Sequence, residues 1–362
     1  MQKARGKSKS GVRPPQSVKP ISLKKLADQL GLAPATVSLV MNGSPVAQTI
    51  APETKKQIFE AARVLNYRPN FFARCLRTRN SLSIGVIVPE VSEGYNAAVL
   101  SGIEDYLLGQ GYLYFVVSHR FKPDLIEEYV QLFLDRHVDG LLAISTPWNR
   151  ELEIPVVTVS SHQTVKGASR IILDHDRAAE LALRHLMLLG HRKVAVIKGQ
   201  SFVPDTEVRW NAIENAARRL GLVISPELVG QIEDNSPLPT LGYKVTQKLL
   251  AAGEFTALFA FNDISAIGAS RAIRDFGLHV PEDVSIVGFD DIVSASYQNP
   301  ALTTVHQPLK KMGRMAAETL LKRISHRNSD GDPIPSVITV APELVVREST
   351  CAVAGGRARL RK

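Results

Sequence analysis

The sequence predicts an α/β protein in which a small all-α head precedes a larger domain built on parallel strands. Up to about residue 67 the apolar residues recur at helical spacing, whereas from Leu82 apolar runs of strand length alternate with helical stretches. Continuous apolar strands indicate a sheet that is buried on both faces. The stretch 82–350 is long for a single sheet, so we expect two lobes.

The head contains two short helices joined by a tight turn within residues 23–43, LKKLADQLGLAPATVSLVMNG. Gly31 supplies the turn, and Pro34 occupies the first position of the second helix. We expect a loop over 44–51 and a third helix from Pro52 to about Leu65. The pattern is typical of a helix-turn-helix that reads DNA, although an ordinary αα-hairpin would show the same spacing.

Charge is distributed unevenly along the chain. Residues 1–81 carry fifteen Lys or Arg residues against three acids, whereas residues 82–350 have a net charge of −7. Four further basic residues lie in the C-terminal tail, 351–362. A basic head on an acidic body indicates a nucleic-acid module attached to another domain. Residues 1–19 are basic and poor in large apolar groups, so we expect a disordered tail.

Composition also bounds the cellular setting. The chain has two cysteines, Cys75 and Cys351, which is too few for a disulfide framework. No apolar run reaches the length of a membrane span, and the basic N-terminus is followed by prolines rather than by the apolar core of a signal peptide. We therefore expect a cytoplasmic protein with no membrane partner.

Residues 70–79, NFFARCLRTR, follow the head. A helix of this length is marginal in water by itself, so one interpretation is a solvated linker over 70–80. The other is a hinge helix that folds on DNA and inserts an apolar residue, Leu76, into the minor groove.

The larger domain shows strand–helix alternation throughout. Strands are predicted at 83–89, 112–117, 138–144, 155–160, 193–197, 256–261 and 284–289. Helices are predicted near 95–109, 123–136, 176–189, 206–220, 239–251, 263–276 and 308–325. Because open α/β sheets bind ligands beyond the carboxyl ends of their strands, we expect ligand contacts just past those ends. The candidates are Tyr95, Ser145, Ser160, Asn262 and Asp290.

Two other classes of protein fit parts of this pattern. Asp174, His175 and Asp176 suggest an acid/base or metal cluster, but adjacent side chains diverge and no further ligand spacing accompanies them. No nucleophile-elbow, Walker A or zinc-protease motif is present. We therefore expect no catalytic residue, metal site or cofactor. A periplasmic sugar-binding protein would explain the larger domain, but the basic head argues against it.

The chain resembles the LacI/GalR, or lactose-repressor, family of bacterial transcription regulators from about residue 20 to 350. The motifs that carry the resemblance are ATVSLVMNG (35–43), LNYRPNFFARCLRT (65–78), IGVIVPEVS (84–92), HLMLLGHRKVAVI (185–197), FNDISAIGASRAIRDFGLHVPEDVSIVGFDD (261–291), LTTVHQP (302–308) and ELVVREST (343–350). The resemblance implies a helix-turn-helix domain at 20–69, a hinge helix and linker at 70–80, and an effector-binding and dimerisation domain at 81–350. That domain would be Rossmann-like, two-lobed and similar to periplasmic binding proteins.

The resemblance also implies a homodimer bound to a near-palindromic operator in double-stranded DNA. A small-molecule effector would control operator affinity allosterically, and repression is the expected outcome. The tail 351–362 lacks the heptad leucines of a coiled coil, so we expect a dimer rather than a tetramer.

For DNA contact the resemblance assigns three groups of residues. The positions that read base edges in the major groove are Pro34, Ala35 and Leu39. The positions that contact phosphates are Thr36, Ser38 and Asn42, with Leu23 at the start of the first helix. The hinge positions at the minor groove are Ala73, Arg74 and Leu76. Leu39 departs from the arginine that is frequent there and cannot grip a guanine. Ala33 stands where a capping serine is usual.

For effector contact the resemblance assigns hydrogen bonding to Asn262 and Asp290, and grip on hydroxyls or a carboxylate to Arg209. Tyr95 replaces an aromatic residue that covers the ligand, and Ser160 replaces an aspartate of sugar binders. A sugar or related polar metabolite is the expected class. The alternative for the neighbouring acids, Asp263 and Asp291, is capping of the helix or turn that follows each strand.

Overall fold

A computed structural model describes residues 21–67, 80–91, 94–233, 240–326 and 334–353. The chain divides into two compact units, residues 1–81 and 82–362, and each is treated by itself below. Within the described ranges, no helix has both the length and the apolar character needed to cross a membrane. The finer boundaries expected after residues 19, 69 and 350 remain predictions.

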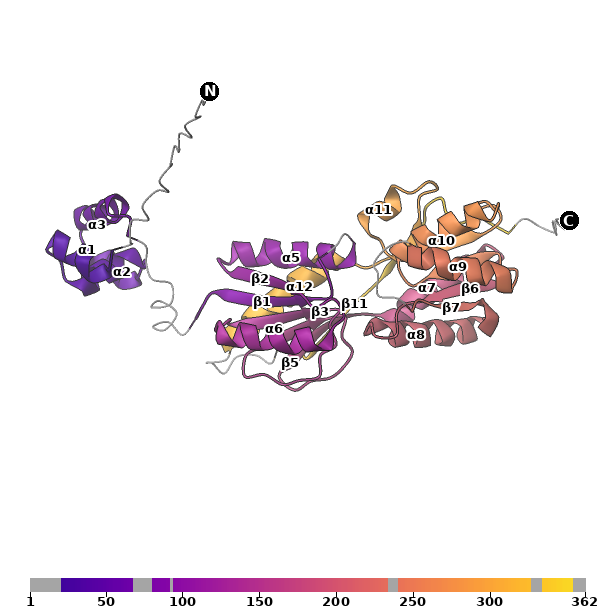
Figure 1. Cartoon of the computed structure of the whole chain (residues 1–362), viewed down its shortest axis with the longest axis horizontal. Helices are drawn as coiled ribbons and strands as arrows, with labels where there is room; N and C mark the ends of the chain where they lie inside the picture. Colours follow the sequence, from indigo (N-terminus) through magenta and orange to yellow (C-terminus); the bar gives the residue numbers. More distant parts are fainter. Residues whose placement is uncertain (1–20, 68–79, 92–93, 234–239, 327–333, 354–362) are drawn as a thin grey trace, which may run out of the picture. The chain divides into compact units, whose positions relative to one another are not determined.

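The first unit is the helical head (Figure 1). Its elements are α1 (Leu23–Leu30), α2 (Pro34–Met41), η1 (Pro45–Thr49) and α3 (Pro52–Val64). Ser22 caps α1 by accepting a hydrogen bond from the Lys25 amide, and Gly31 ends it with a left-handed φ of 63°. Pro34 begins α2 as predicted, because its missing N–H lies where a helix has no acceptor for it.

The helices of the head enclose a small apolar core. Its buried members are Leu26, Ala27, Val37, Val40, Ala47, Ile58 and Ala62. The segment expected as a plain loop contains a 3₁₀ helix instead, because Pro45 starts a turn and Ala47 is buried in this core. Ala47 also donates its amide to the Ser44 carbonyl, which tightens that turn.

The second unit contains two six-stranded sheets, and the first defines the N-lobe (Figure 1). Its strand order is β11-β5-β4-β3-β1-β2, with all pairs parallel. The strands are β1 (Ser83–Val88), β2 (Leu113–Ser118), β3 (Gly140–Ile144), β4 (Val156–Val159), β5 (Ala168–Leu173) and β11 (Val337–Val340). The helices are α5 (Tyr95–Gly109), α6 (Pro123–Asp135) and α12 (Leu309–His326). Helices α5 and α12 share one apolar cluster with the sheet, and α6 packs in another.

The second sheet defines the C-lobe, with the order β12-β10-β9-β8-β6-β7. Its strands are β6 (Val194–Lys198), β7 (Val229–Gln231), β8 (Ala257–Ala260), β9 (Ser285–Asp290), β10 (Thr303–His306) and β12 (Glu343–Val345). Its helices are α7 (His175–Leu188), α8 (Asp205–Leu220), η2 (Pro226–Leu228), α9 (Thr240–Ala252), α10 (Asp263–Asp275) and α11 (Val293–Ser296). Only β12 runs antiparallel to its neighbour.

The chain passes between the lobes three times in the described part of the second unit. It leaves the N-lobe after β5, returns from β10 into α12, and leaves again from β11 to β12. Strands β5, β7, β10, β11 and β12 were not predicted from the sequence. Four of them have only three or four residues, and the apolar run of the longer β5 is interrupted by Ser169 and Arg170. The two-lobed, largely parallel architecture that the apolar runs predicted is confirmed.

Two glycines explain the close crossing of α5 and α12. A Cβ at Gly102 would lie 1.9 Å from the Lys310 carbonyl oxygen, and one at Gly313 would lie 2.0 Å from the Val99 carbonyl oxygen. The helix backbones therefore touch at reciprocal positions where any side chain would collide. This contact fixes α12 on the N-lobe. Helix α12 begins directly after the chain has crossed from the C-lobe.

Candidate functional site

The exposed face of α2 is the candidate DNA-reading surface of the head. Pro34 and Ala35 are exposed, and Thr36 and Ser38 are partly exposed. Leu39 is also partly exposed, and its side chain packs against the head core. A leucine in this position presents an apolar edge, which can contact a thymine methyl group but offers no hydrogen bond.

The C-terminal end of α2 is held by a side-chain hydrogen bond. Asn42 donates from Nδ2 to the Ser38 carbonyl oxygen at 2.7 Å and to Ser38 Oγ at 3.2 Å. Leu23 opens α1, where it is partly buried against the head core. Ala33 makes no side-chain cap at the start of α2, as its methyl group requires. The hinge candidates Ala73, Arg74 and Leu76 lie outside the described residues.

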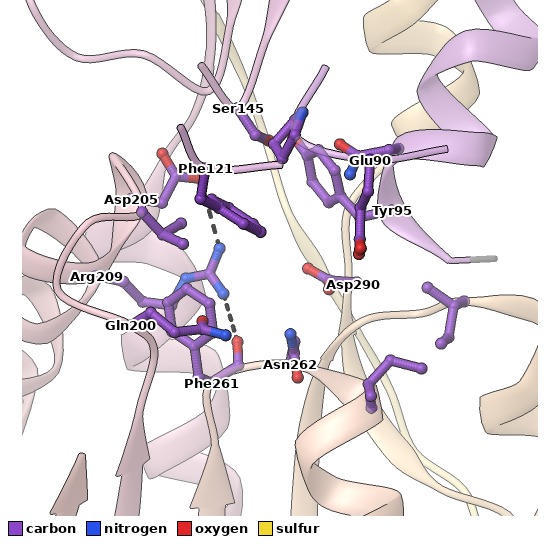
Figure 2. A pocket seen from close by; sticks show the side chains of 15 residues that line it. Glu90, Tyr95, Phe121, Ser145, Gln200, Asp205, Arg209, Phe261, Asn262 and Asp290 are labelled. Atoms are coloured by element: carbon purple, nitrogen blue, oxygen red, sulfur yellow. Dashed lines mark hydrogen bonds and ion pairs between the residues drawn. The ribbon is translucent and has the colours of Figure 1, made fainter. Parts of the chain in front are cut away.

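The second candidate site is a cleft between the two lobes, with a cavity of about 140 Å³ (Figure 2). Of the six residues predicted to contact a ligand, five line it: Tyr95, Ser145, Arg209, Asn262 and Asp290. Other lining residues were not predicted from the sequence, among them Glu90, Asn96, Phe121, Gln200, Asp205 and Phe261. Phe121 and Gln200 follow the ends of β2 and β6, so the rule applied to the other strands could have found them.

Backbone geometry distinguishes several residues beside the cleft. Ser145, Ser160 and Asp290 each have a positive φ, of 45°, 57° and 110° respectively. Left-handed backbone is uncommon for residues with a Cβ and is concentrated at functional sites. Here it falls just past β3 and β4 and at the last residue of β9, where the chain turns away from the sheet edge.

Arg209 is buried and tightly held, with 3 % of its surface exposed. Its guanidinium carbon lies 3.7 Å from the centre of the Phe289 ring and 4.3 Å from that of Phe261. It donates to the Phe261 carbonyl oxygen and lies 3.6 Å from Oδ2 of Asp205 (Figure 2). Stacking on aromatic faces fixes the plane of the guanidinium, so its remaining N–H groups are presented to the cleft in one orientation.

Asp290 is the second charged group of the cleft. Burial raises its pKa to about 7, against the opposing effects of Arg209 and of the hydrogen bond from Gln307. That hydrogen bond runs from Gln307 Nε2 to Oδ1 at 2.6 Å. A carboxyl with a pKa near neutrality can either accept or donate a hydrogen bond to a bound ligand.

Asn262 both caps a helix and lines the cleft. Its Oδ1 accepts a hydrogen bond from the Ser265 amide at the start of α10. Asp263 has a structural role, because its carboxylate accepts from the Ile292 amide and from Thr304 Oγ1. Asp291 pairs with Arg347 and His306 rather than facing the cleft. Both neighbouring acids therefore make contacts within the protein, but these contacts are not the caps expected from the sequence, since Asn262 is the residue that caps α10.

Ser160 does not line the cavity, unlike the other predicted contacts. Its Oγ lies 2.5 Å from the hydroxyl of Tyr95, and the serine is 2 % exposed. Burial raises the pKa of Tyr95, so this hydroxyl stays protonated. Ser160 therefore holds the Tyr95 ring through its hydroxyl.

Three polar side chains meet in the wall of the cleft beside Arg209. His162 Nε2 lies 2.9 Å from Asp205 Oδ1, and His175 Nε2 lies 3.6 Å from Asp205 Oδ2. Burial by itself would raise the pKa of Asp205, but the two histidines and Arg209 hold it below its usual range. Burial lowers the pKa of His175, which favours the neutral imidazole. No sequence spacing signals this group, because its members come from separate elements.

A helix-turn-helix head and a two-lobed domain with a polar cleft define a DNA-binding regulator that responds to a small molecule. Residues 22–70 match the family described as bacterial regulatory proteins of the lacI family, and residues 183–350 match a periplasmic binding protein-like domain. The transcriptional repressor PurR of Haemophilus influenzae is 32 % identical over 345 residues, covering 92 % of this chain and 99 % of the relative.

Solved structures agree with this match. The lac repressor dimer, bound to operator and the anti-inducer ONPF, aligns with a TM-score of 0.80 at 25 % identity, covering 92 % of this chain and all of that one. The regulator CelR in complex with cellobiose aligns with a TM-score of 0.67 at 26 % identity, covering 91 % of this chain and 99 % of that one. The chain belongs to the LacI family of transcription regulators, and these relatives are regulators rather than enzymes.

Proposed function

We propose that this LacI-family regulator represses transcription as a homodimer on a near-palindromic operator, and that a polar small molecule in the cleft changes its operator affinity. The observation that carries the proposal is the composition of the cleft, because both lobes contribute polar side chains to its lining. Tyr95 and Ser145 belong to one lobe, and Arg209 and Asp290 belong to the other. The affinity for a ligand held by all four therefore depends on the relative orientation of the two lobes.

The cleft favours a ligand that carries several hydroxyl groups. Arg209 offers planar N–H donors, and Asn262 and Gln200 contribute side-chain amides. Asp290, with a pKa of about 7, can pair with a hydroxyl in either protonation state. The aromatic faces of Tyr95 and Phe121 suit the apolar face of a ring. A sugar or related polar metabolite therefore suits the lining of the cleft, and the similar regulator CelR is described in complex with cellobiose.

Exposed apolar side chains on the second unit support the homodimer. Strand β2 is at the edge of its sheet, and its Leu113 and Phe115 are 56 % and 40 % exposed. On the C-lobe, Val293 and Tyr297 are 77 % and 81 % exposed. Exposed apolar edges of this kind are normally covered by a partner. A second copy of the chain would cover both surfaces, and the similar lac repressor is described as a dimer.

The hinge links the proposed ligand response to DNA. Ligand binding that favours one lobe orientation would change the spacing of two hinge segments in a dimer, and thereby the fit of Leu76 to the minor groove. A coupling free energy of about 1–3 kcal/mol is sufficient, and it must be reciprocal between ligand and DNA.

Selection of bound sites from a random duplex DNA pool tests the proposal. The expected result is an enriched near-palindrome, bound by two copies of the chain in sedimentation analysis. The selection is repeated with pooled metabolites, and the pool that changes affinity is fractionated. Absence of an enriched sequence in every pool, or binding by a single copy, would contradict the proposal.

A further inference from the structure

The cluster of His162, His175 and Asp205 is not explained by the family function. In the described ranges these three are the group whose ligand-type atoms all lie within 4.8 Å of one another. They come from three segments: the loop between β4 and β5, the first residue of α7, and the first residue of α8. Two imidazoles and a carboxylate form a donor set that recurs at transition-metal sites.

His175 is an orphaned polar group within this cluster. It is 5 % exposed, and neither of its ring nitrogens has a hydrogen-bond partner. Its Nε2 is 3.6 Å from Asp205 Oδ2, which is beyond ordinary hydrogen-bond length. Buried polar nitrogens nearly always have a hydrogen-bond partner. An unpaired imidazole beside a carboxylate is therefore suited to bind a ligand together with that carboxylate.

We propose that His162, His175 and Asp205 bind a divalent transition-metal ion such as Zn²⁺, with an open coordination position toward the cleft. Ligand atoms about 2.0–2.1 Å from a tetrahedral zinc lie roughly 3.3 Å from one another. His162 Nε2 lies 2.9 Å from Oδ1 of Asp205 and His175 Nε2 lies 3.6 Å from Oδ2, so each imidazole is near this separation from one oxygen of the shared carboxylate. Three protein ligands leave a fourth position, which an oxygen or nitrogen of the bound molecule can occupy.

The local charges accommodate a cation. Arg209 is 3.6 Å from Asp205, but its hydrogen bond to the Phe261 carbonyl oxygen and its stacking on Phe289 are independent of that carboxylate. Asp205 can therefore turn toward a metal while Arg209 stays in place. Asp290 supplies a second carboxyl in the same cleft. Two imidazoles favour zinc, copper or nickel over calcium and magnesium, which prefer oxygen ligands.

The proposed ion would also connect the lobes. His162 belongs to an N-lobe loop, whereas His175 and Asp205 begin helices of the C-lobe. Metal binding would then favour the lobe orientation that brings the three residues together, and would fix one donor atom of the ligand. This regulatory consequence rests on the proposed function, but the metal site itself does not.

Metal binding to the full-length chain tests the site directly. After treatment with a chelator, the protein is titrated with Co²⁺ and followed by visible absorption, and with Zn²⁺ by calorimetry. We expect one ion per chain and the intense visible bands of four- or five-coordinate cobalt. His162→Gln and His175→Gln should each weaken Zn²⁺ binding by more than about 100-fold, because even supporting residues of metal sites reach that loss.

A second ligand variant and a matched control make the result interpretable. His162 is only partly buried, so H162Q serves if the buried H175Q fails to fold. His279→Gln is the matched control, because His279 pairs with Asp283 at 3.1 Å on the surface, where its side chain is 70 % exposed. Equal Zn²⁺ affinity in wild type and H162Q, loss only in H279Q, or weak octahedral cobalt bands would overturn the site and leave an ion-pair network. Operator selection is read separately, so either proposal can fail alone.

Discussion

His162 Nε2 lies 2.9 Å from Asp205 Oδ1, and this contact joins a loop of the N-lobe to the first turn of α8 in the C-lobe. It is made within the wall of the cleft, since Asp205 also lines the cavity. Because the two residues belong to different lobes, the contact exists only in lobe orientations that bring them together. Such a contact differs in free energy between orientations, which is what a ligand-controlled equilibrium requires.

Arg209→Ala should abolish the response to the effector while operator affinity without effector stays within about threefold, because the head does not depend on this side chain. The guanidinium supplies planar donors and stacks between Phe289 and Phe261. Arg209→Lys should fail to restore the response, since an ammonium cannot stack or donate in a plane. Operator affinity is measured by fluorescence anisotropy with and without effector. Loss of operator binding itself would count against the ligand role.

Asp290→Asn should make stability less sensitive to pH. The folded pKa of about 7 exceeds the ordinary value of about 3.9, so the folded chain binds more protons than the unfolded chain between those values. The free energy of unfolding contributed by this group therefore falls as pH rises from about 4 to about 7, by at most about 4 kcal/mol. The variant keeps an oxygen for Gln307 and removes the titration.

The measurement is thermal unfolding of chelator-treated protein at pH 5 and pH 8. We expect wild type and D290N to unfold at similar temperatures at pH 5, and D290N to be the more stable at pH 8. Parallel pH profiles for the two proteins would show that Asp290 is ionised in the free cleft.

Gly102→Ala should destabilise the second unit by about 1–3 kcal/mol or more, because the new methyl group meets the Lys310 carbonyl and helix backbones cannot yield easily. Both tryptophans, Trp148 and Trp210, lie in this unit, so their emission during urea unfolding reports on it alone. Gly109→Ala is the control on the same helix, since nothing lies within 4 Å of its added Cβ. Equal stability of the two variants would contradict the close crossing.

Ala33→Ser should stabilise α2 by about 1 kcal/mol, because the cap position has extended backbone and lacks a side-chain acceptor. Hydrogen exchange of the first amides of α2 should slow about fivefold, which is that free energy expressed as a rate. Ser44→Ala is the control, because Ser44 makes no side-chain cap in the head. Unchanged exchange in A33S would mean that the helix start is limited by other contacts.

Leu76→Ala should weaken binding to the selected operator at least tenfold and leave binding to random DNA nearly unchanged, if Leu76 wedges into the minor groove. The wedge contributes only where the duplex is deformed at a specific site, whereas phosphate contacts act on any sequence. Leu188→Ala removes an 82 % exposed leucine from the second unit and should change neither affinity. Equal losses on both DNAs would reject the wedge assignment.

Much of the fold could be predicted from local sequence. The end of α1 follows from Gly31 and the start of α2 from Pro34, because helix starts and stops depend on neighbouring residues. Long apolar strands such as β1 and β9 were found because burial on both faces requires an apolar run. Strand β12 was not predicted, because its three residues include Glu343 and it is a strand only through its pairing with β10.

The contacts in and around the cleft also divide into those that could be predicted from the sequence and those that could not. Tyr95, Ser145, Arg209, Asn262 and Asp290 were predicted as ligand contacts from strand ends or from the family resemblance, and the structure gathers them in one cavity. The sequence by itself therefore determined the class of protein, the alternation of elements and the sheet edge that lines the cleft. Only the tertiary structure placed Ser160 against the Tyr95 hydroxyl and brought His162 and His175 to Asp205. The physical reason is that these contacts join segments far apart in the sequence, within one lobe for Ser160 and Tyr95 and across the lobes for His162 and Asp205, so their distances depend on packing rather than on any spacing along the chain.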